Sequence, residues 1–196
     1  MQNRITLSAL DLRGAEILAS WGNDPEFLRA AEWSTASVEA RSAFWRSIVS
    51  SPPEQLLRFA ATEIADVVGY LDIHGSGDRR ELGFAVGPDR WGKGLGGAMA
   101  HAGLEYAFGT LALQCVWAEA WATNAASIAI LTRLGMRHVG RGEEGVYLGE
   151  PTCYEQFELQ REDWTQRSSP GTQPGWPGEG PAGHPNLLIR GSDYLL

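Results

Sequence analysis

The spacing of apolar and polar positions along the chain predicts an alternation of strands and helices. Short apolar runs bounded by turn residues predict strands at residues 5–10, 58–63, 67–74, 79–86, 116–121, 136–141 and 154–159. Apolar residues at helical spacing predict helices at residues 12–20, 38–49, 97–108 and 125–134. Asp11 and Ser37 directly precede two of these helices, and both residue types favour the N-cap position. The segment between these two helices, residues 21–37, is mixed and rich in loop residues.

The pattern changes in the C-terminal part of the chain. Ten of the eighteen residues from 168 to 185 are Gly or Pro, which predicts a linker rather than a packed core. Beyond it the chain becomes apolar again, at Leu187-Leu188-Ile189 and at Tyr194-Leu195-Leu196. We therefore expect one domain at residues 1–164 and an appendage at residues 165–196. The end of the appendage is expected to dock either on its own domain or on a second subunit, as in a homodimer.

A glycine-dense turn follows the strand predicted at residues 79–86. Its sequence is Arg90-Trp91-Gly92-Lys93-Gly94-Leu95-Gly96-Gly97, and it contains the only lysine of the chain. Glycine tolerates positive φ and lets a ligand approach the backbone, while the N–H groups at a helix N-terminus attract anions. The turn therefore predicts a seat for a pyrophosphate. Its spacing fits neither the fingerprint G-x-G-x-x-G nor a P-loop, which disfavours a dinucleotide or a nucleoside triphosphate.

The charge of the chain narrows the choice of partners. With 16 Lys and Arg against 24 Asp and Glu, the net charge is -8, which argues against nucleic acid and is compatible with a cationic substrate. The chain has neither a run of 18 apolar residues nor a secretory leader, so we expect no membrane contact and a cytoplasmic protein. Cys115 and Cys153 are expected to be reduced core thiols. The four histidines show no metal-ligand spacing, so we expect no metal site.

Three stretches resemble those of a known enzyme family. The first resembles motif A of the GNAT N-acetyltransferases: Glu81-Leu82-Gly83-Phe84-Ala85-Val86-Gly87-Pro88-Asp89-Arg90-Trp91-Gly92-Lys93-Gly94-Leu95-Gly96. The second resembles the motif that follows it in the family: Asn124-Ala125-Ala126-Ser127-Ile128-Ala129-Ile130-Leu131-Thr132-Arg133-Leu134-Gly135-Met136. The third resembles the end of the subgroup of ribosomal-protein N-terminal acetyltransferases: Tyr154-Glu155-Gln156-Phe157-Glu158-Leu159 and Arg161-Glu162-Asp163-Trp164. The resemblance covers about residues 3–164.

The resemblance implies an α/β fold of the α+β kind, with a mixed, mainly antiparallel sheet flanked by helices. The fourth and fifth strands of this fold splay apart, and acetyl-CoA enters the gap as the cosubstrate. Backbone amides of the glycine turn would hold the pyrophosphate, the preceding strand would bond the pantetheine arm, and the next helix would add a contact. The implied cofactor contacts are Phe84, Ala85, Val86, Trp91, Gly92, Lys93, Gly94, Leu95, Gly96, Gly97, Asn124 and Ser127.

Two positions depart from the family pattern. Trp91 stands where the motif usually has Gln or Arg, and Arg90 is a partial substitute. Leu131 stands where many members have the tyrosine that protonates the departing thiolate, and leucine has no proton to give. The subgroup resemblance implies that Ser127 takes that catalytic role, one helical turn earlier on the same face. Helix capping or packing is an equal alternative for Ser127.

The reaction also needs a base, because an amine acceptor is normally protonated. The resemblance implies Glu81 in this role, and an ion pair with a neighbouring arginine, Arg79 or Arg80, is the alternative. Contacts to the acceptor are expected from acidic and aromatic side chains, since these hold cations by ion pairing and by cation–π contact. Our candidates are Asp24, Trp33, Glu144 and Tyr154.

The sequence is therefore expected to encode an acetyl-CoA-dependent N-acetyltransferase in which the amine attacks the thioester directly. The first choice of acceptor is a small cationic amine, either a polyamine or an aminoglycoside-like antibiotic, which would make the enzyme a resistance determinant. The second choice is the α-amine of a protein or peptide. A non-catalytic sensor that binds acyl-CoA is the third, and the leucine at position 131 keeps it open.

Overall fold

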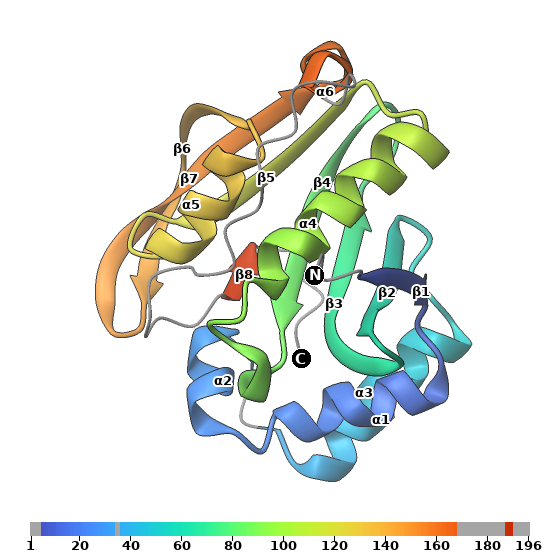
Figure 1. Cartoon of the computed structure of the whole chain (residues 1–196). Coiled ribbons are helices and arrows are strands. Elements are labelled where there is room, and N and C mark those ends of the chain that lie inside the picture. The colour runs from blue at the N-terminus through green and yellow to red at the C-terminus, as the bar shows by residue number, and fades with distance from the viewer. Residues whose placement is uncertain (1–4, 34–35, 168–186, 190–196) are drawn as a thin grey trace.

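The computed structural model describes residues 5–33, 36–167 and 187–189, and Figure 1 shows how its elements are arranged. The strands are β1 (Thr6–Ala9), β2 (Leu56–Glu63), β3 (Asp66–His74), β4 (Arg79–Val86), β5 (Cys115–Trp121), β6 (Arg137–Tyr147), β7 (Glu150–Gln160) and β8 (Leu187–Ile189). The helices are α1 (Leu12–Trp21), α2 (Pro25–Ala30), α3 (Val38–Ser50), α4 (Leu95–Glu105), α5 (Ala125–Arg133) and α6 (Arg161–Arg167), with a 3-10 turn η1 (Pro88–Arg90) and a π-helical turn η2 (Tyr106–Thr110). Within these residues, every helix falls short of the length and apolar character that a membrane span requires.

The strands of the described residues form one sheet in the order β1-β2-β3-β4-β5-β7-β6, and β8 pairs with β4 off this path. All pairings are antiparallel except that of β4 with β5. Parallel neighbours need a crossover connection, and α4 supplies it across one face of the sheet (Figure 1). The predicted mixed, mainly antiparallel sheet flanked by helices is confirmed.

Strands β4 and β5 run together at one end and separate at the other. Their pairing begins at Arg79 with Cys115 and ends at Glu81 with Trp117. Beyond that point β4 continues against β3 as far as Val86, and β5 continues against β7 to its own end. The expected separation of the fourth and fifth strands is therefore present, and Figure 1 shows β8 in red between them.

Side chains alternate between the two faces of the sheet and create two main cores. On one face, Phe84 of β4 packs with Met99 of α4 and Leu131 of α5 in the larger core. On the other face, Ala85 packs with side chains of α1, α2 and α3 in a second core. Trp91, in the glycine turn, packs against both cores and so connects them.

Helix α2 corrects the expectation of a loop-rich segment at residues 21–37. Asp24 begins the helix, because its carboxylate accepts hydrogen bonds from the backbone N–H groups of Glu26 at 2.8 Å and Phe27 at 2.9 Å. The helix has six residues, which is too few to display helical periodicity in a sequence. The N-caps expected at Asp11 and Ser37 are confirmed.

Strands β6 and β7 correct two further boundaries. Each is eleven residues long, so both exceed the strands expected at 136–141 and 154–159. Most residues of β6 are exposed, and an exposed strand need not show a clear apolar alternation. The acidic residues 143, 144 and 150 therefore belong to the β6–β7 hairpin.

The C-terminal appendage is described only at β8. The linker expected at residues 168–185 and the apolar end at residues 194–196 lie outside the described residues. Strand β8 pairs with β4 of the same chain, so these three residues dock on their own domain. That is the first of the two alternatives that the sequence left open.

Candidate active site

The turn between β4 and α4 has the backbone geometry that a phosphate group needs. Gly92 and Gly94 both adopt a φ of 73°, which side chains other than glycine rarely tolerate. Gly94 is the N-cap residue of α4, and no described side chain caps the helix there. The first-turn N–H groups and the positive end of the helix dipole therefore fit a pyrophosphate.

Close packing holds this turn against β4 and α5. A Cβ atom on Gly96 would lie 3.1 Å from Cδ1 of Ile130 and 3.3 Å from Cε2 of Phe84, so a side chain there would push α4 away. Trp91 donates its indole N–H to the Val86 carbonyl at 2.8 Å. The Trp91 side chain therefore anchors the turn, while its backbone amide remains a predicted cofactor contact.

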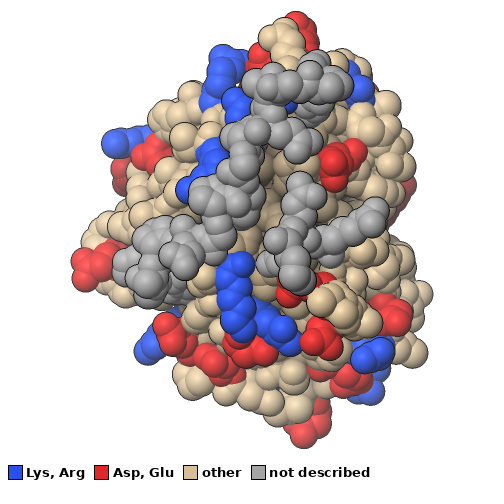
Figure 2. Space-filling model, viewed as in Figure 1, with Lys and Arg blue, Asp and Glu red and all other residues tan. Residues whose placement is uncertain are grey.

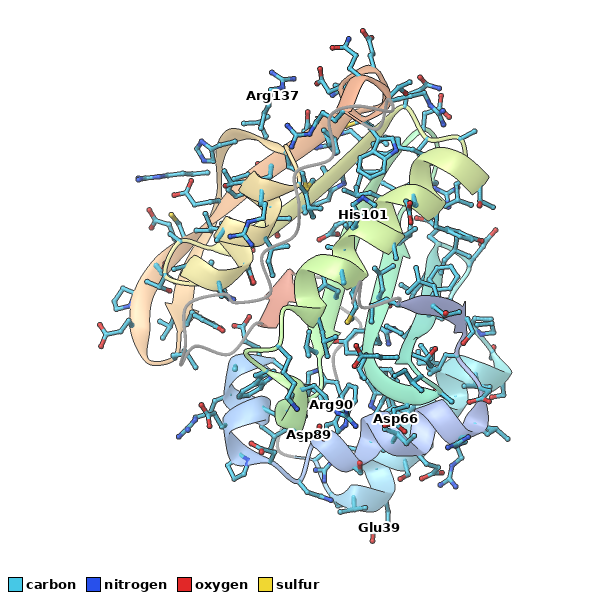
Figure 3. The ribbon with its side chains drawn as sticks, in the orientation of Figure 1. Glu39, Asp66, Asp89, Arg90, His101 and Arg137 are labelled. Carbon is cyan, nitrogen blue, oxygen red and sulfur yellow. The ribbon has the colours of Figure 1, made fainter. Side chains whose placement is uncertain are left out.

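Basic side chains near the turn are engaged by local acceptors. Arg90 lies 3.1 Å from a carboxylate oxygen of Asp89 and 3.2 Å from one of Asp66, and Figure 3 shows these three residues together. Lys93 is exposed, and its Nζ donates to the backbone carbonyl of Asp89 at 2.8 Å. Figure 2 shows basic side chains grouped near this turn with acidic side chains around them. Lys93 therefore supplies positive charge at the turn that no described carboxylate within salt-bridge distance offsets.

Two buried carboxylates lie near the point where β4 and β5 separate. Glu81 is 2% exposed and Glu119 is 7% exposed. Glu81 is paired across the ladder with Trp117, and Glu119 follows two positions later on β5, so both side chains share one face of the sheet. Glu119 accepts a hydrogen bond from Nε2 of Gln156 at 3.1 Å. The separating strands thus carry one carboxylate each.

The neighbours of Glu81 differ from those expected. His74 lies directly across on β3, with its Nδ1 4.0 Å from a carboxylate oxygen of Glu81. Arg79 pairs with Glu158 at 2.6 Å, and Arg80 donates to a backbone carbonyl at 3.2 Å. Arg79 and Arg80 thus have acceptors other than Glu81, and His74 is a titratable neighbour of Glu81. The role of Glu81 as a base stays a prediction.

The first turn of α5 holds two predicted residues. The side-chain oxygen of Asn124 accepts a hydrogen bond from the Ser127 backbone N–H at 3.1 Å, so Asn124 is the N-cap of α5. Ser127 is fully buried, and Leu131 is buried one turn further along in the larger core. Asn124 rather than Ser127 is thus the N-cap residue, and the catalytic role of Ser127 stays a prediction beside its structural role in the first turn.

Three aromatic side chains and one carboxylate gather at the end of β5, and we name them the Glu32 cluster (Glu32, Trp121, Tyr147 and Tyr154). The rings of Trp121 and Tyr154 stack with their centroids 3.6 Å apart. Trp121 donates its indole N–H to a carboxylate oxygen of Glu32 at 2.7 Å, and the Tyr154 hydroxyl lies 3.5 Å from the same oxygen. The Tyr147 hydroxyl donates to the Ala30 carbonyl at 3.2 Å. The cluster therefore joins α2 to β5, β6 and β7.

The Glu32 cluster has the character of a site for a cation. Glu32 is exposed, whereas the three aromatic side chains are buried. Glu32 has a φ of 53°, which is uncommon for a residue with a side chain, and such strained positions cluster at functional sites. Burial and the charge of Glu32 raise the pKa of Tyr147 to about 12, so this hydroxyl stays neutral near pH 7. A carboxylate resting on aromatic rings is complementary to an ammonium group with an alkyl chain.

The structure separates the four predicted acceptor contacts. Tyr154 belongs to the Glu32 cluster. Trp33 is buried in the second core, where its ring centroid is 4.9 Å from that of Phe27. Asp24 caps α2, and Glu144 is exposed on β6. Contacts from these last three residues to an acceptor stay predictions.

The sequence analysis did not select Glu119, Trp121 or Glu32. A signal for the first two exists, because the segment Trp117-Ala118-Glu119-Ala120-Trp121 alternates large and small residues. That alternation places its three large side chains on one face of a strand. Glu32 stands next to Trp33 among the acidic and aromatic residues expected to attract a cation, but its contacts could not be predicted because its partners are 89 and 122 positions away along the chain.

Strand β8 lies against the backbone predicted to bind the pantetheine arm. Ile189 pairs with Phe84, and Leu187 pairs with Ala85, with an irregularity between the two positions. Cys115 and Cys153 are both free thiols, but only Cys115 is buried, so the expected core position is confirmed for Cys115 and wrong for the half-buried Cys153. Among the described residues, no group of three His, Cys, Asp or Glu is arranged to hold a metal ion.

Comparison with known proteins gives a family match and two curated relatives. The family described as "Acetyltransferase (GNAT) domain" matches residues 4–137. A Bacillus licheniformis protein named "Uncharacterized N-acetyltransferase p20" is 26% identical over 145 residues, which cover 70% of this chain and 81% of that protein. The "FsC-acetyl coenzyme A-N(2)-transacetylase" of Aspergillus fumigatus is 32% identical over 100 residues, which cover 47% of this chain and 41% of that protein.

Solved structures share the fold at low sequence identity. A spermidine N-acetyltransferase from Vibrio cholerae, solved in complex with CoA and spermine, matches with a TM-score of 0.71 and 15% identity over 83% of this chain and 98% of that one. An acetyltransferase of the GNAT family from Bacillus anthracis matches with a TM-score of 0.69 and 18% identity over 81% and 96%. These likenesses support the same arrangement of sheet and helices.

Proposed function

Because the chain belongs to the acetyltransferase (GNAT) domain family and is an acetyl-CoA-dependent acetyltransferase, we propose that it acetylates a small cationic amine, with polyamines as the leading class. The observation that carries this proposal is the Glu32 cluster, an exposed carboxylate held by two buried aromatic side chains. Spermidine N-acetyltransferases among the fold neighbours are compatible with it. Membership of the ribosomal-protein subgroup stays a prediction.

The positions of three carboxylates suit an extended amine. Glu32 stands at the far end of β5, while Glu119 and Glu81 lie closer to the point where β4 and β5 separate. A polyamine carries positive charges spaced along an alkyl chain, so one ammonium group can pair with Glu32 while another reaches the gap. Stacked Trp121 and Tyr154 hold the Glu32 carboxylate at one end of this path. The net charge of -8 adds long-range attraction for cations.

The proposed roles in the reaction follow from these places. Glu81 takes a proton from the ammonium group, directly or through a water molecule, which frees the nitrogen lone pair. The nitrogen attacks the thioester carbonyl carbon, a C–N bond forms, and the C–S bond breaks. Backbone N–H groups at residues 84–86 stabilise the developing oxyanion, and one such donor contributes about 3–4 kcal/mol. Ser127 passes its hydroxyl proton to the departing thiolate and receives the second proton that the attacking nitrogen loses, so the serine ends the step as a hydroxyl.

Thiol release from acetyl-CoA tests this proposal with a panel of spermidine, spermine, an aminoglycoside and a short peptide. We expect the highest kcat/KM with the polyamines. A peptide as the best acceptor would replace the proposal by the α-amine alternative. Absence of thiol release with every amine would favour the sensor.

Substitution of Glu32 tests the site separately. Glu32→Gln removes one charge, so the KM for polyamines should rise about tenfold while kcat stays similar. Glu26→Gln is the matched control, because Glu26 is an exposed acid on α2 outside the Glu32 cluster. Equal KM values for the two variants would remove Glu32 from the acceptor site.

A further inference from the structure

Strand β8 lies against the part of β4 that is predicted to bind the cofactor. It pairs antiparallel with β4 at Phe84 and Ala85 and also contacts β5 and α5. Figure 1 shows it between β4 and the layer of α5 and β5. Residues 187–189 therefore lie in the gap where β4 and β5 separate.

The geometry of β4 explains why a strand can bind there. One edge of β4 is paired with β3 along its length, whereas the pairing of the other edge with β5 ends at Glu81. Alternate residues of the stretch 82–86 thus direct their backbone N–H and C=O groups toward the gap, while the residues between them bond to β3. An open strand edge of this kind recruits an extended chain. Leu187, Leu188 and Ile189 are residue types that favour extended structure or apolar surroundings.

The same edge is the predicted seat of the pantetheine arm, which is itself an extended chain with two amide groups. A backbone N–H or C=O group that is paired with β8 is not available to a second extended partner. We propose that β8 is an internal competitor of acetyl-CoA, so that the cofactor binds only when β8 leaves β4. This inference rests on the cofactor seat that the proposed function requires.

The proposal makes cofactor affinity depend on the fraction of molecules with β8 undocked. Because both strands belong to one chain, this fraction is independent of protein concentration. When a binding-competent state is populated at a fraction f, the apparent Kd equals the intrinsic Kd divided by f. If β8 is docked in about 80–90% of molecules, CoA should bind about five- to tenfold more weakly than to a chain whose β8 cannot pair.

The test uses the full chain with two prolines in β8, Leu187→Pro/Ile189→Pro. Proline has no backbone N–H and is excluded from the interior of a paired strand, so the variant should lose the β8 pairing. Calorimetric titration with CoA should give a Kd about five- to tenfold lower than that of the original chain. The matched control Ser192→Pro/Tyr194→Pro has the same proline spacing outside β8 and should leave the Kd unchanged.

Hydrogen exchange supplies a readout that needs no activity and no acceptor. Without CoA, the amide of Phe84, which faces the gap, should be protected in the original chain and should exchange faster in the Leu187→Pro/Ile189→Pro variant. The amide of Ala85 faces β3 and should stay protected in both proteins, so it serves as an internal control. With saturating CoA, both proteins should protect the Phe84 amide. Equal Kd values, or equal exchange of the Phe84 amide without CoA, would overturn the proposal.

Two further outcomes separate this inference from the proposed function. If neither protein binds CoA, the predicted cofactor-binding site is wrong and β8 is not a competitor of CoA. A difference in exchange between the two proteins would, in that case, still establish that β8 pairs with β4. Protection of the Phe84 amide that rises with protein concentration would show that β8 comes from a second copy, which also overturns the internal contact.

Discussion

The glycine turn between β4 and α4, which is predicted to hold the cofactor and is called the cofactor turn here, and the Glu32 cluster are built in opposite ways. The cofactor turn uses backbone groups of a few consecutive residues, with positive φ at Gly92 and Gly94 and a helix that begins at Leu95. The Glu32 cluster uses side chains from four separate segments of the chain, joined by hydrogen bonds and ring stacking. The first is therefore specified locally in the sequence, and the second exists only once the sheet has formed.

The two sites are therefore sensitive to different kinds of substitution. A backbone site loses function when a residue forces the chain out of its unusual conformation, whatever the chemistry of the new side chain. A site made of side chains loses function when one charge or donor is removed, even if the backbone stays in place. Substitutions that act on one site and spare the other test the comparison directly.

The largest effect is expected for Gly94→Val. A β-branched side chain at a φ of 73° distorts the turn and withdraws N–H groups from the phosphates. Loss of two such hydrogen bonds, at about 1.5–3 kcal/mol each, weakens CoA binding about a thousandfold in a calorimetric titration. Gly149→Val is the control, because Gly149 has a φ of 91° in the β6–β7 turn. It should be destabilised similarly yet bind CoA normally, and a parallel loss of affinity would contradict the phosphate seat.

The next largest effect is expected for Glu81→Gln. Removal of a general base should lower kcat/KM about a hundredfold and raise the optimum pH, because the amine must then lose its proton to solvent. Glu119→Gln should lower kcat/KM less and leave the optimum pH in place. CoA affinity should be unchanged in both variants. The reverse order in the pH profiles would assign the base to Glu119.

The role of Ser127 is tested by Ser127→Ala at saturating substrates. Without its hydroxyl proton, the turnover of bound substrates should fall about tenfold or more while the Kd for CoA stays similar. Leu131 cannot take over the proton transfer. Turnover equal to that of the original chain would leave Ser127 with a packing role in α5.

An alkaline pH should destabilise the Glu32 cluster through Tyr147. Its pKa is raised to about 12 by burial and by Glu32, whereas an unfolded tyrosine titrates near about 10. Between these two values the unfolded chain releases a proton that the folded chain keeps, so stability falls by about 1.4 kcal/mol per pH unit as pH rises. Urea denaturation at pH 8 and pH 11 should show a smaller loss for Tyr147→Phe. Equal losses of stability in the original chain and in Tyr147→Phe would show that a group other than Tyr147 causes the loss.

The smallest effect is expected for Trp91→Phe. The substitution keeps a ring against both cores but removes the hydrogen bond to the Val86 carbonyl. The free energy of unfolding should fall by about 1 kcal/mol, while the Kd for CoA changes by less than about threefold. Trp164→Phe is the control, because its ring stacks on Phe108 without contributing to the turn. A large loss of CoA affinity in Trp91→Phe would show that the indole acts on the cofactor directly.

The features that could be predicted from the sequence are mainly those that neighbouring residues specify. The strand at residues 79–86, the glycine turn and the capped helices were predicted because their signals lie within a few neighbouring residues. Helix α2 was missed because it is too short to show a period, and the extent of β6 because its residues are mostly exposed. Glu119 could have been found from the alternation around it. The contacts of Glu32 could not, and docking of the apolar C-terminal part was expected but not its place on β4, since both depend on partners far away in the sequence.

The length of helix α2 determines how two of its contacts are oriented relative to each other. At one end the ring of Phe27 stacks on Trp91 with centroids 6.4 Å apart, and at the other end the Ala30 carbonyl accepts the Tyr147 hydroxyl. Three residues separate these contacts, which is close to one helical turn of 3.6 residues. An inserted residue would therefore rotate one contact by about 100° relative to the other, rather than simply lengthen the spacer. Natural variation in this segment is accordingly expected to conserve its length more strictly than its composition.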